Sequence, residues 1–212
     1  MNNILSKFYF FGPLLYHVKL KDEDIQKFKT LCVKDKNKFY RNNLAGHIKH
    51  EYKIDHTNLQ ILLQDVIEDF RKSFEAFYNI LAPEVYITNA WVNFMQPGDF
   101  NPPHTHAGSF SSVLFINMPQ ELLEENEEHK SHDINSAGPG SISFFAGVNG
   151  GMSNWRQDFT PKTGELFMFP ADLMHMVYPY KSNVERITLS FNMAIVDEKE
   201  YQNKIAKSKK LK

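Results

Sequence analysis

Three histidines in the second half of the chain have types and spacing suited to a metal site. His104 and His106 stand one residue apart in Asn101-Pro102-Pro103-His104-Thr105-His106, which closes an extended stretch expected to begin near Trp91. Because side chains alternate along an extended chain, both imidazoles point to the same face. Neutral imidazole binds iron, copper, nickel and zinc. The pair therefore predicts a metal site, and His175, about seventy residues further along, is the candidate third ligand.

An arginine follows the third histidine at short spacing. Arg186 comes eleven positions after His175, and Thr188 two positions later. The turn-like stretch 179–183 is expected to join the apolar runs on either side into a hairpin, in which His175 lies opposite Arg186 and both point to one face. An unpaired buried charge costs several kcal/mol, and no acidic residue nearby in the sequence is an obvious partner for Arg186. We therefore expect one cavity that holds a metal and a carboxylate-bearing ligand, which arginine binds through two parallel hydrogen bonds.

The elements that must position these residues are mostly strands. Short apolar or alternating runs recur through the second half of the chain, separated by turns that contain Pro and Gly. An earlier strand is predicted over residues 8–18, interrupted at Gly12-Pro13. The other predicted strands span residues 85–95, 111–118, 141–145, 165–169, 174–178 and 186–196.

Two helices are predicted upstream of these strands. Residues 21–33 are expected to form a short helix with Asp22 as its N-cap. From 57 to 80, apolar residues recur at three- and four-residue steps, which predicts an amphipathic helix of about six turns that packs on a sheet. Residues 34–55 are polar without a clear period, and residues 120–136 are expected to form an acidic loop.

Together these elements predict a mainly β protein of the α+β class. We expect a single domain over residues 1–198, with helical support at about 20–82 and a strand-rich barrel at about 85–196. The Lys-rich segment 199–212 is expected to be a basic, disordered tail.

Composition limits the compartment and the partners. A net charge of −1 favours neither nucleic acid nor an anionic membrane as a partner. The single cysteine, Cys32, excludes an internal disulfide and fits a reducing cytosol. No apolar stretch reaches transmembrane length. We therefore expect a cytoplasmic protein, monomeric or homodimeric, that acts on a small-molecule or peptidyl substrate.

The spaced set of residues resembles the motif of the Fe(II)- and 2-oxoglutarate-dependent dioxygenases. That family has a His-x-Asp/Glu pair, a distal His, an Arg about ten residues beyond it, and a Ser or Thr two further on. His104, His175, Arg186 and Thr188 occupy the matching positions. The resemblance covers roughly residues 85–196 and is closest to members found in bacteria and phages.

The resemblance implies a fold, cofactors and residue roles. The fold is a double-stranded β-helix (a jelly roll, cupin-like) with N-terminal helices packed on one sheet. The cofactors are Fe(II), 2-oxoglutarate as co-substrate and O2, and the reaction hydroxylates a substrate. The implied metal ligands are His104, His106 and His175; the implied co-substrate contacts are Arg186, Thr188, Asn93 and Ser112.

One position departs from the family pattern. His106 stands where the family has a carboxylate, so three neutral imidazoles would leave Fe(II) with its full double charge. In a second alignment, His106-Ala107-Gly108 resembles the His-x-Ala/Gly motif of the halogenase branch, in which chloride replaces the carboxylate. Another alternative needs no change of alignment: Asp99 or Asp172 supplies the missing carboxylate through space.

Cupins fit parts of the same stretch. Gly98 precedes His104-Thr105-His106 as in the first cupin motif, and the segment from Gly164 through Pro170 to His175 resembles the second. The cupin glutamate expected after His106 is absent, and the cupin motif leaves Arg186 unused. A non-catalytic, zinc-stabilised jelly roll is a third interpretation. Metal analysis and a 2-oxoglutarate binding test separate the three.

Overall fold

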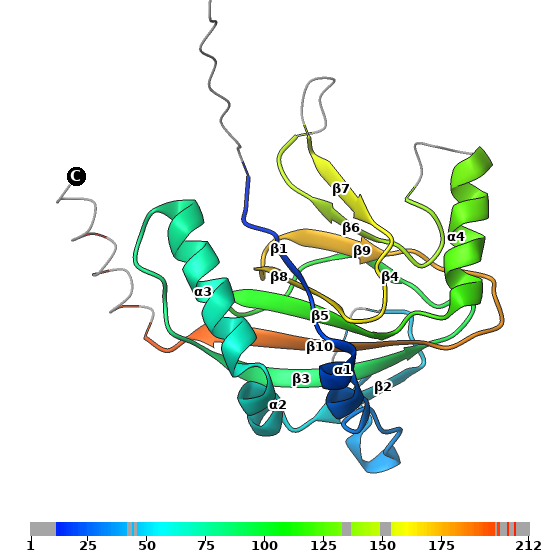
Figure 1. The fold of residues 1–212 in the computed structure, drawn as a ribbon, viewed down its shortest axis with the longest axis horizontal. Helices are drawn as coiled ribbons and strands as arrows, with labels where there is room; N and C mark the ends of the chain where they lie inside the picture. The colour runs from blue at the N-terminus through cyan, green and yellow to red at the C-terminus, as the bar shows by residue number, and fades with distance from the viewer. Residues whose placement is uncertain are drawn as a thin grey trace, which may run out of the picture.

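Two antiparallel sheets form the centre of the structure (Figure 1). The computed structural model describes residues 12–41, 44, 46–132, 137–148, 154–197, 199, 203 and 206. The six-stranded sheet has the order β1 (Tyr16–Lys19), β8 (Glu165–Pro170), β5 (Phe110–Asn117), β10 (Arg186–Ile195), β3 (Val85–Met95) and β2 (His50–Ile54). The four-stranded sheet has the order β4 (Asn101–His104), β9 (Met174–Val177), β6 (Ile142–Phe145) and β7 (Arg156–Phe159).

Helices cover one face of the six-stranded sheet. Helices α1 (Asp22–Lys29), α2 (His56–Leu62) and α3 (Gln64–Tyr78) bury apolar side chains in one core with strands of that sheet. The ring of Phe70 on α3 meets the ring of Phe110 edge-on at 5.1 Å. A second core, with Phe115, Phe144 and Phe167 at its centre, joins the two sheets. The inner face of the six-stranded sheet therefore looks towards the four-stranded sheet.

The strand predictions are largely confirmed. The six strands predicted between residues 85 and 196 appear with each end within one residue of its predicted position. Strands β2 and β7 were not predicted, and β4 is separate from β3 because a turn at Gly98, with φ +83°, intervenes. Of the strand predicted over 8–18, residues 8–11 lie outside the described part, and β1 begins at Tyr16.

Three helical predictions need correction. The long amphipathic helix breaks at Leu63, whose φ of −101° and ψ of 6° separate α2 from α3. The helix α1 begins at Asp22, so Lys21 and not Asp22 is the N-cap. The acidic segment forms a helix, α4 (Gln120–His132), where a loop was predicted. Its Glu- and Leu-rich sequence has high helix propensity, and Glu125 accepts hydrogen bonds from the backbone amides of Lys181 and Ser182.

The predicted hairpin between β9 and β10 is wrong. Figure 1 shows β9 in the layer of β4, β6 and β7, whereas β10 lies in the other layer between β3 and β5. The chain crosses between the sheets after β9, and Tyr180 anchors the crossing because its hydroxyl donates to the Met95 carbonyl and accepts from the Arg186 amide. Arg186 therefore lies opposite Met95, and His175 opposite His104.

Two further predictions concern the chain ends and membranes. Of the predicted basic tail 199–212, all but residues 199, 203 and 206 lie outside the described part of the chain. No helix in the described part is both long and apolar enough to cross a membrane.

Candidate metal centre

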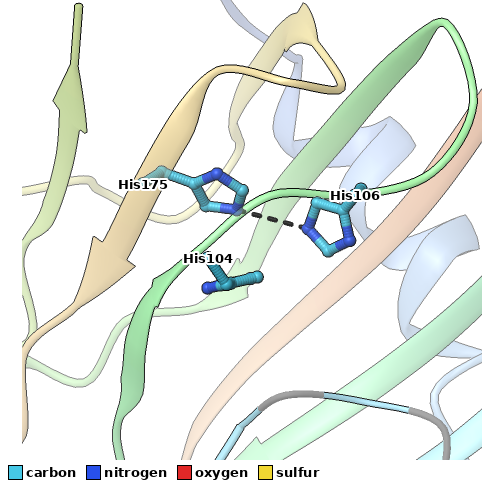
Figure 2. Close-up of side chains that lie close together, drawn as sticks. All are labelled: His104, His106 and His175. Carbon is cyan, nitrogen blue, oxygen red and sulfur yellow. Dashed lines mark hydrogen bonds between the residues drawn. The ribbon is translucent and has the colours of Figure 1, made fainter.

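Three histidines meet between β4, β9 and the loop after β4 (Figure 2). His104 and His175 are directly opposed on neighbouring antiparallel strands, so their side chains share a face, and their ring centres are 4.3 Å apart. His106 lies two residues beyond the end of β4, where its backbone amide donates to the Ala171 carbonyl at 2.8 Å. One ring nitrogen of each histidine lies within 4.8 Å of the others. The sequence prediction that these three residues meet is confirmed.

Backbone contacts set the orientation of two of the rings. Nδ1 of His104 lies 2.7 Å from the Pro102 carbonyl oxygen, and Nδ1 of His175 lies 2.9 Å from the Leu173 carbonyl oxygen. A carbonyl accepts only, so each Nδ1 carries the proton and each Nε2 keeps its lone pair. Metal-binding histidines are fixed by this kind of outer hydrogen bond. Nε2 of His175 faces Nε2 of His106 at 3.3 Å (Figure 2).

The histidines are neutral at physiological pH. Burial lowers the pKa of His106 to about 4 and that of His175 to about 3, and neighbouring His104 adds to both effects. Burial also lowers the pKa of His104. Since imidazole must be neutral to coordinate a metal, the cluster is ready to bind one without first losing protons.

The carboxylates proposed as alternative ligands do not join this cluster. Asp99 is buried, and its carboxylate accepts a hydrogen bond from the Gln96 amide at 3.0 Å. Asp172 is exposed. Among the described residues, the only group with the spacing of a metal site consists of the three histidines.

Arg186 lies in the same cavity as a buried charge without an anion. Its side chain is 2% exposed, and none of the ion pairs among the described residues includes it. Its Nη1 lies 3.0 Å from the Met95 sulfur, and its guanidinium carbon lies 4.9 Å from the centre of the Phe115 ring. Its Nε has no hydrogen-bond partner in the described part of the chain. Burial lowers its pKa to about 10, so the side chain stays charged at pH 7.

Polar side chains of the six-stranded sheet continue this wall. Thr188 lies opposite Asn93 on the neighbouring strand. The amide nitrogen of Asn93 donates to the Thr188 hydroxyl at 3.0 Å and lies 3.2 Å from the Ser190 hydroxyl. The side-chain oxygens of Asn93 and Ser112 are buried without a partner among the described residues. The structure thus brings all seven residues singled out in the sequence to one cavity.

Among the further residues of the cavity, sequence reasoning missed two that bear on its chemistry. Glu51 on β2 and Asn101 on β4 line it as well, and each has a buried oxygen without a partner among the described residues. Glu51 stands in the polar segment 34–55, which carries no periodic signal. Its place became visible only through the pairing of β2 with β3.

A family comparison agrees with this geometry. Residues 89–192, which run from β3 to β10, match a family described as "Putative 2OG-Fe(II) oxygenase", in which 2OG denotes 2-oxoglutarate. This segment belongs to the 2OG-Fe(II) oxygenase family. The chain is an oxygenase dependent on Fe(II) and 2-oxoglutarate, as the resemblance implied. No curated protein matches the chain in sequence.

Solved structures share the fold of this oxygenase. A 2OG-Fe(II) oxygenase family oxidoreductase from Burkholderia pseudomallei is 14% identical, with a TM-score of 0.54 over 85% of this chain and 84% of the other. A prolyl-4-hydroxylase from Pseudomonas putida is 15% identical, with a TM-score of 0.52 over 84% and 91%. The viral collagen prolyl hydroxylase of Paramecium bursaria Chlorella virus-1 is 12% identical, with a TM-score of 0.54 over 85% and 96%. At these identities the likeness is one of fold.

Proposed function

We propose that this oxygenase holds Fe(II) through His104, His106 and His175 and couples oxidative decarboxylation of 2-oxoglutarate to hydroxylation of a small-molecule or peptidyl substrate. The observation that carries the proposal is the unmatched guanidinium of Arg186 in the cavity of the histidine cluster. A zinc-stabilised structural site needs no such charge. A dianionic co-substrate that reaches from the metal to Arg186 accounts for both features.

The polar groups that line the cavity suit these ligands chemically. Three lone-pair-bearing nitrogens of neutral imidazoles suit a divalent transition metal. Among the described residues, the Arg186 Nε–H and the Ser112 hydroxyl have no partner, so they are free to donate to a carboxylate. When bound, Fe(II) with O2 supplies the oxidation of 2-oxoglutarate to succinate and CO2 and the insertion of oxygen into a C–H bond of the substrate.

The protein's own part is to bind, orient and exclude water. Arg186 and Thr188 are assigned to the distal carboxylate of 2-oxoglutarate. Asn93 and Ser112 are assigned as further hydrogen-bond partners of the co-substrate. Phe169 packs edge-on against the His175 ring at 4.8 Å, which keeps water from that side of the cluster.

The order in which the chain visits the sheets supports a double-stranded β-helix over a single domain of residues 1–198. After β3 in the six-stranded sheet, β4 lies in the four-stranded sheet, β5 returns, and the same exchange is repeated through β6, β8, β9 and β10. A jelly roll is built by such exchange between two sheets. We place the oxygenase in the cytoplasm on the basis of its single cysteine.

A binding experiment tests the assignment. The protein loaded with Ni(II), which prevents turnover, is titrated with 2-oxoglutarate by calorimetry. Wild type should bind 2-oxoglutarate, and Arg186→Lys, which keeps the charge but loses the planar fork, should bind it about 5–150-fold more weakly, the range that corresponds to about 1–3 kcal/mol. Arg71→Lys on α3, outside the cavity, is the matched control. Metal binding without any affinity for 2-oxoglutarate would favour a cupin-type protein.

A further inference from the structure

Glu51 is a buried carboxylate that the proposed chemistry does not use. Its side chain is 1% exposed, and its Oε2 has no hydrogen-bond partner among the described residues. No ion pair among those residues includes it. Buried carboxylates are rare unless paired, because an unpaired one costs free energy. The position of Glu51 therefore requires an explanation.

Strand pairing places Glu51 on the wall of the cavity. Glu51 lies opposite Asn93, and Asn93 lies opposite Thr188, so the three side chains form one row on the inner face of the six-stranded sheet. With neighbouring strands about 4.8 Å apart, Glu51 stands about 10 Å across the sheet from β10, which carries Arg186. The cavity thus has an arginine at one end of this face and a carboxylate at the other.

Asn101 adds a second acceptor at the carboxylate end. Its Oδ1 is also buried without a partner among the described residues. A Cβ atom placed on Gly46 would overlap Asn101 Oδ1 and lie 3.6 Å from Glu51 Oε1, so the two side chains flank the same point of the Gly46 backbone. Two neighbouring acceptors call for a group that offers several N–H donors.

Charge decides which kind of donor group fits. Glu51 is the only acidic residue among the described residues that line the cavity. With three neutral imidazoles, the double charge of a divalent metal is cancelled by dianionic 2-oxoglutarate, and the positive charge of Arg186 remains, so a cationic substrate group needs an anion beside it to enter. Burial raises the pKa of Glu51 to about 7; Arg41 opposes this effect and Asp99 adds to it. A cation at Glu51 would lower that pKa again, so carboxylate and cation would stabilise each other.

We propose that Glu51, with Asn101, binds a cationic nitrogen group of the substrate, an ammonium or a guanidinium, at the end of the cavity remote from Arg186. This inference rests on the proposed function, because it takes the Arg186 end to be occupied by 2-oxoglutarate. The substrate class is then an amine-bearing molecule, either a small-molecule amine or a basic side chain of a peptide.

Trp91 provides a local signal for the test. It lines the cavity with its ring centre 5.8 Å from that of His106, and the only other tryptophan, Trp155, does not line it. In a Trp155→Phe background, the Ni(II)-loaded protein with saturating 2-oxoglutarate is titrated with n-hexylamine and with 1-hexanol, while the emission of Trp91 is recorded. The amine should bind saturably and at least tenfold more tightly than the alcohol.

Variants at Glu51 decide the assignment. Glu51→Gln should reduce the amine-over-alcohol preference to less than threefold, whereas Glu51→Asp, which keeps the charge, should retain most of it. Glu84→Gln, on the exposed surface, is the matched control. No saturable amine response in wild type, or an undiminished preference in Glu51→Gln, would overturn the proposal.

Two further arms separate the possible outcomes. Blocked tripeptides with a central lysine or norleucine replace the hexyl probes; tighter binding of the lysine peptide than of hexylamine indicates a peptidyl source, and the reverse a small molecule. Calorimetry of 2-oxoglutarate with the same proteins is independent of Glu51. If 2-oxoglutarate binds but the protein shows no preference for the amine, the assignment of Glu51 as a cation site is wrong and the proposed function stands. If the protein prefers the amine through Glu51 but does not bind 2-oxoglutarate, the proposed function is wrong. The amine would then still bind at Glu51, but it could not be assigned as the substrate of a 2-oxoglutarate-dependent reaction.

Discussion

Replacing Arg186 with methionine should have opposite effects on stability with and without 2-oxoglutarate. Methionine is unbranched and apolar, so it fills much of the same space without the charge. The ligand-free variant should be more stable than wild type. With saturating 2-oxoglutarate, the order should reverse, because only wild type gains from binding.

The magnitude follows from the burial of the guanidinium. The pKa of Arg186 falls from 12.5 to about 10. Since a tenfold change in proton affinity corresponds to about 1.4 kcal/mol, holding the charge in this place costs about 3 kcal/mol. The contact with the Phe115 ring at 4.9 Å offsets part of this cost, about 1–2 kcal/mol for a desolvated pair. The net gain for Arg186→Met is about 1–2 kcal/mol.

Thermal unfolding of the Ni(II)-loaded proteins measures both effects. For a chain of this length, a gain of that size raises Tm by about 2–8 °C. At a 2-oxoglutarate concentration of 100 times Kd, wild type gains about 2.7 kcal/mol by mass action, whereas the variant should gain nothing. Arg71→Met, which removes an ion pair with Glu68 outside the cavity, should keep the full response to 2-oxoglutarate. A ligand-free Arg186→Met protein less stable than wild type, or one equally stabilised by 2-oxoglutarate, would refute the reasoning.

Four other outcomes are expected. His104→Ala or His175→Ala should abolish Fe(II) binding in an anaerobic titration without unfolding the sheets, and undiminished affinity would contradict the ligand assignment. His106→Asp should weaken metal binding, because the shorter side chain falls short of a site built around imidazole; unchanged or tighter binding would make His106 a bystander. Since burial lowers the pKa of all three histidines, to about 4 for His106 and to about 3 for His175, protons compete less for this site than for free imidazole, so Ni(II) affinity should fall less between pH 7.5 and 6 than the affinity of free imidazole does. Burial raises the pKa of Glu51 to about 7 in the folded state, so the contribution of Glu51 to the stability of wild type falls as pH rises from 4.5 through 7. Glu51→Gln should therefore be more stable than wild type above pH 7 but not at pH 4.5.

The strands of the cavity could be predicted because their sequences carry the pattern locally. Strand β3 is rich in residues with high β propensity, and its predicted and observed bounds coincide. Strand β7, with the sequence Arg-Gln-Asp-Phe, carries no such pattern, and it is a strand because it pairs with β6. Propensity is overridden by pairing in such short segments.

The incorrect hairpin prediction shows that spacing in the sequence does not establish which strands pair. His175 and Arg186 were expected to share a cavity because they were expected to be paired, and they do share one without being paired. The connection after β9 was taken as a symmetric turn. It is instead a crossing between sheets held by Tyr180, and nothing in a single sequence distinguishes the two.

Glu51 lay beyond prediction for a different reason. The segment around it is polar, so a glutamate there is expected on the surface. Its burial arises because β2 extends the six-stranded sheet at the side of β3 and turns Glu51 towards the cavity.

Strand β10 explains how this sheet serves both the core and the cavity. Leu189, Phe191 and other apolar residues alternate along it with Arg186, Thr188 and Ser190. Such alternation normally places the polar residues in water, but here the second sheet covers them, and both sets are buried. The apolar set packs in the core beneath the helices, and the polar set lines the cavity. Each polar group left without a partner costs about 1–3 kcal/mol, a cost that a bound ligand would offset. The six-stranded sheet thus provides the polar side chains that would bind the co-substrate, while the four-stranded sheet and its loops hold the three histidines. A co-substrate bound to the metal would therefore contact both sheets.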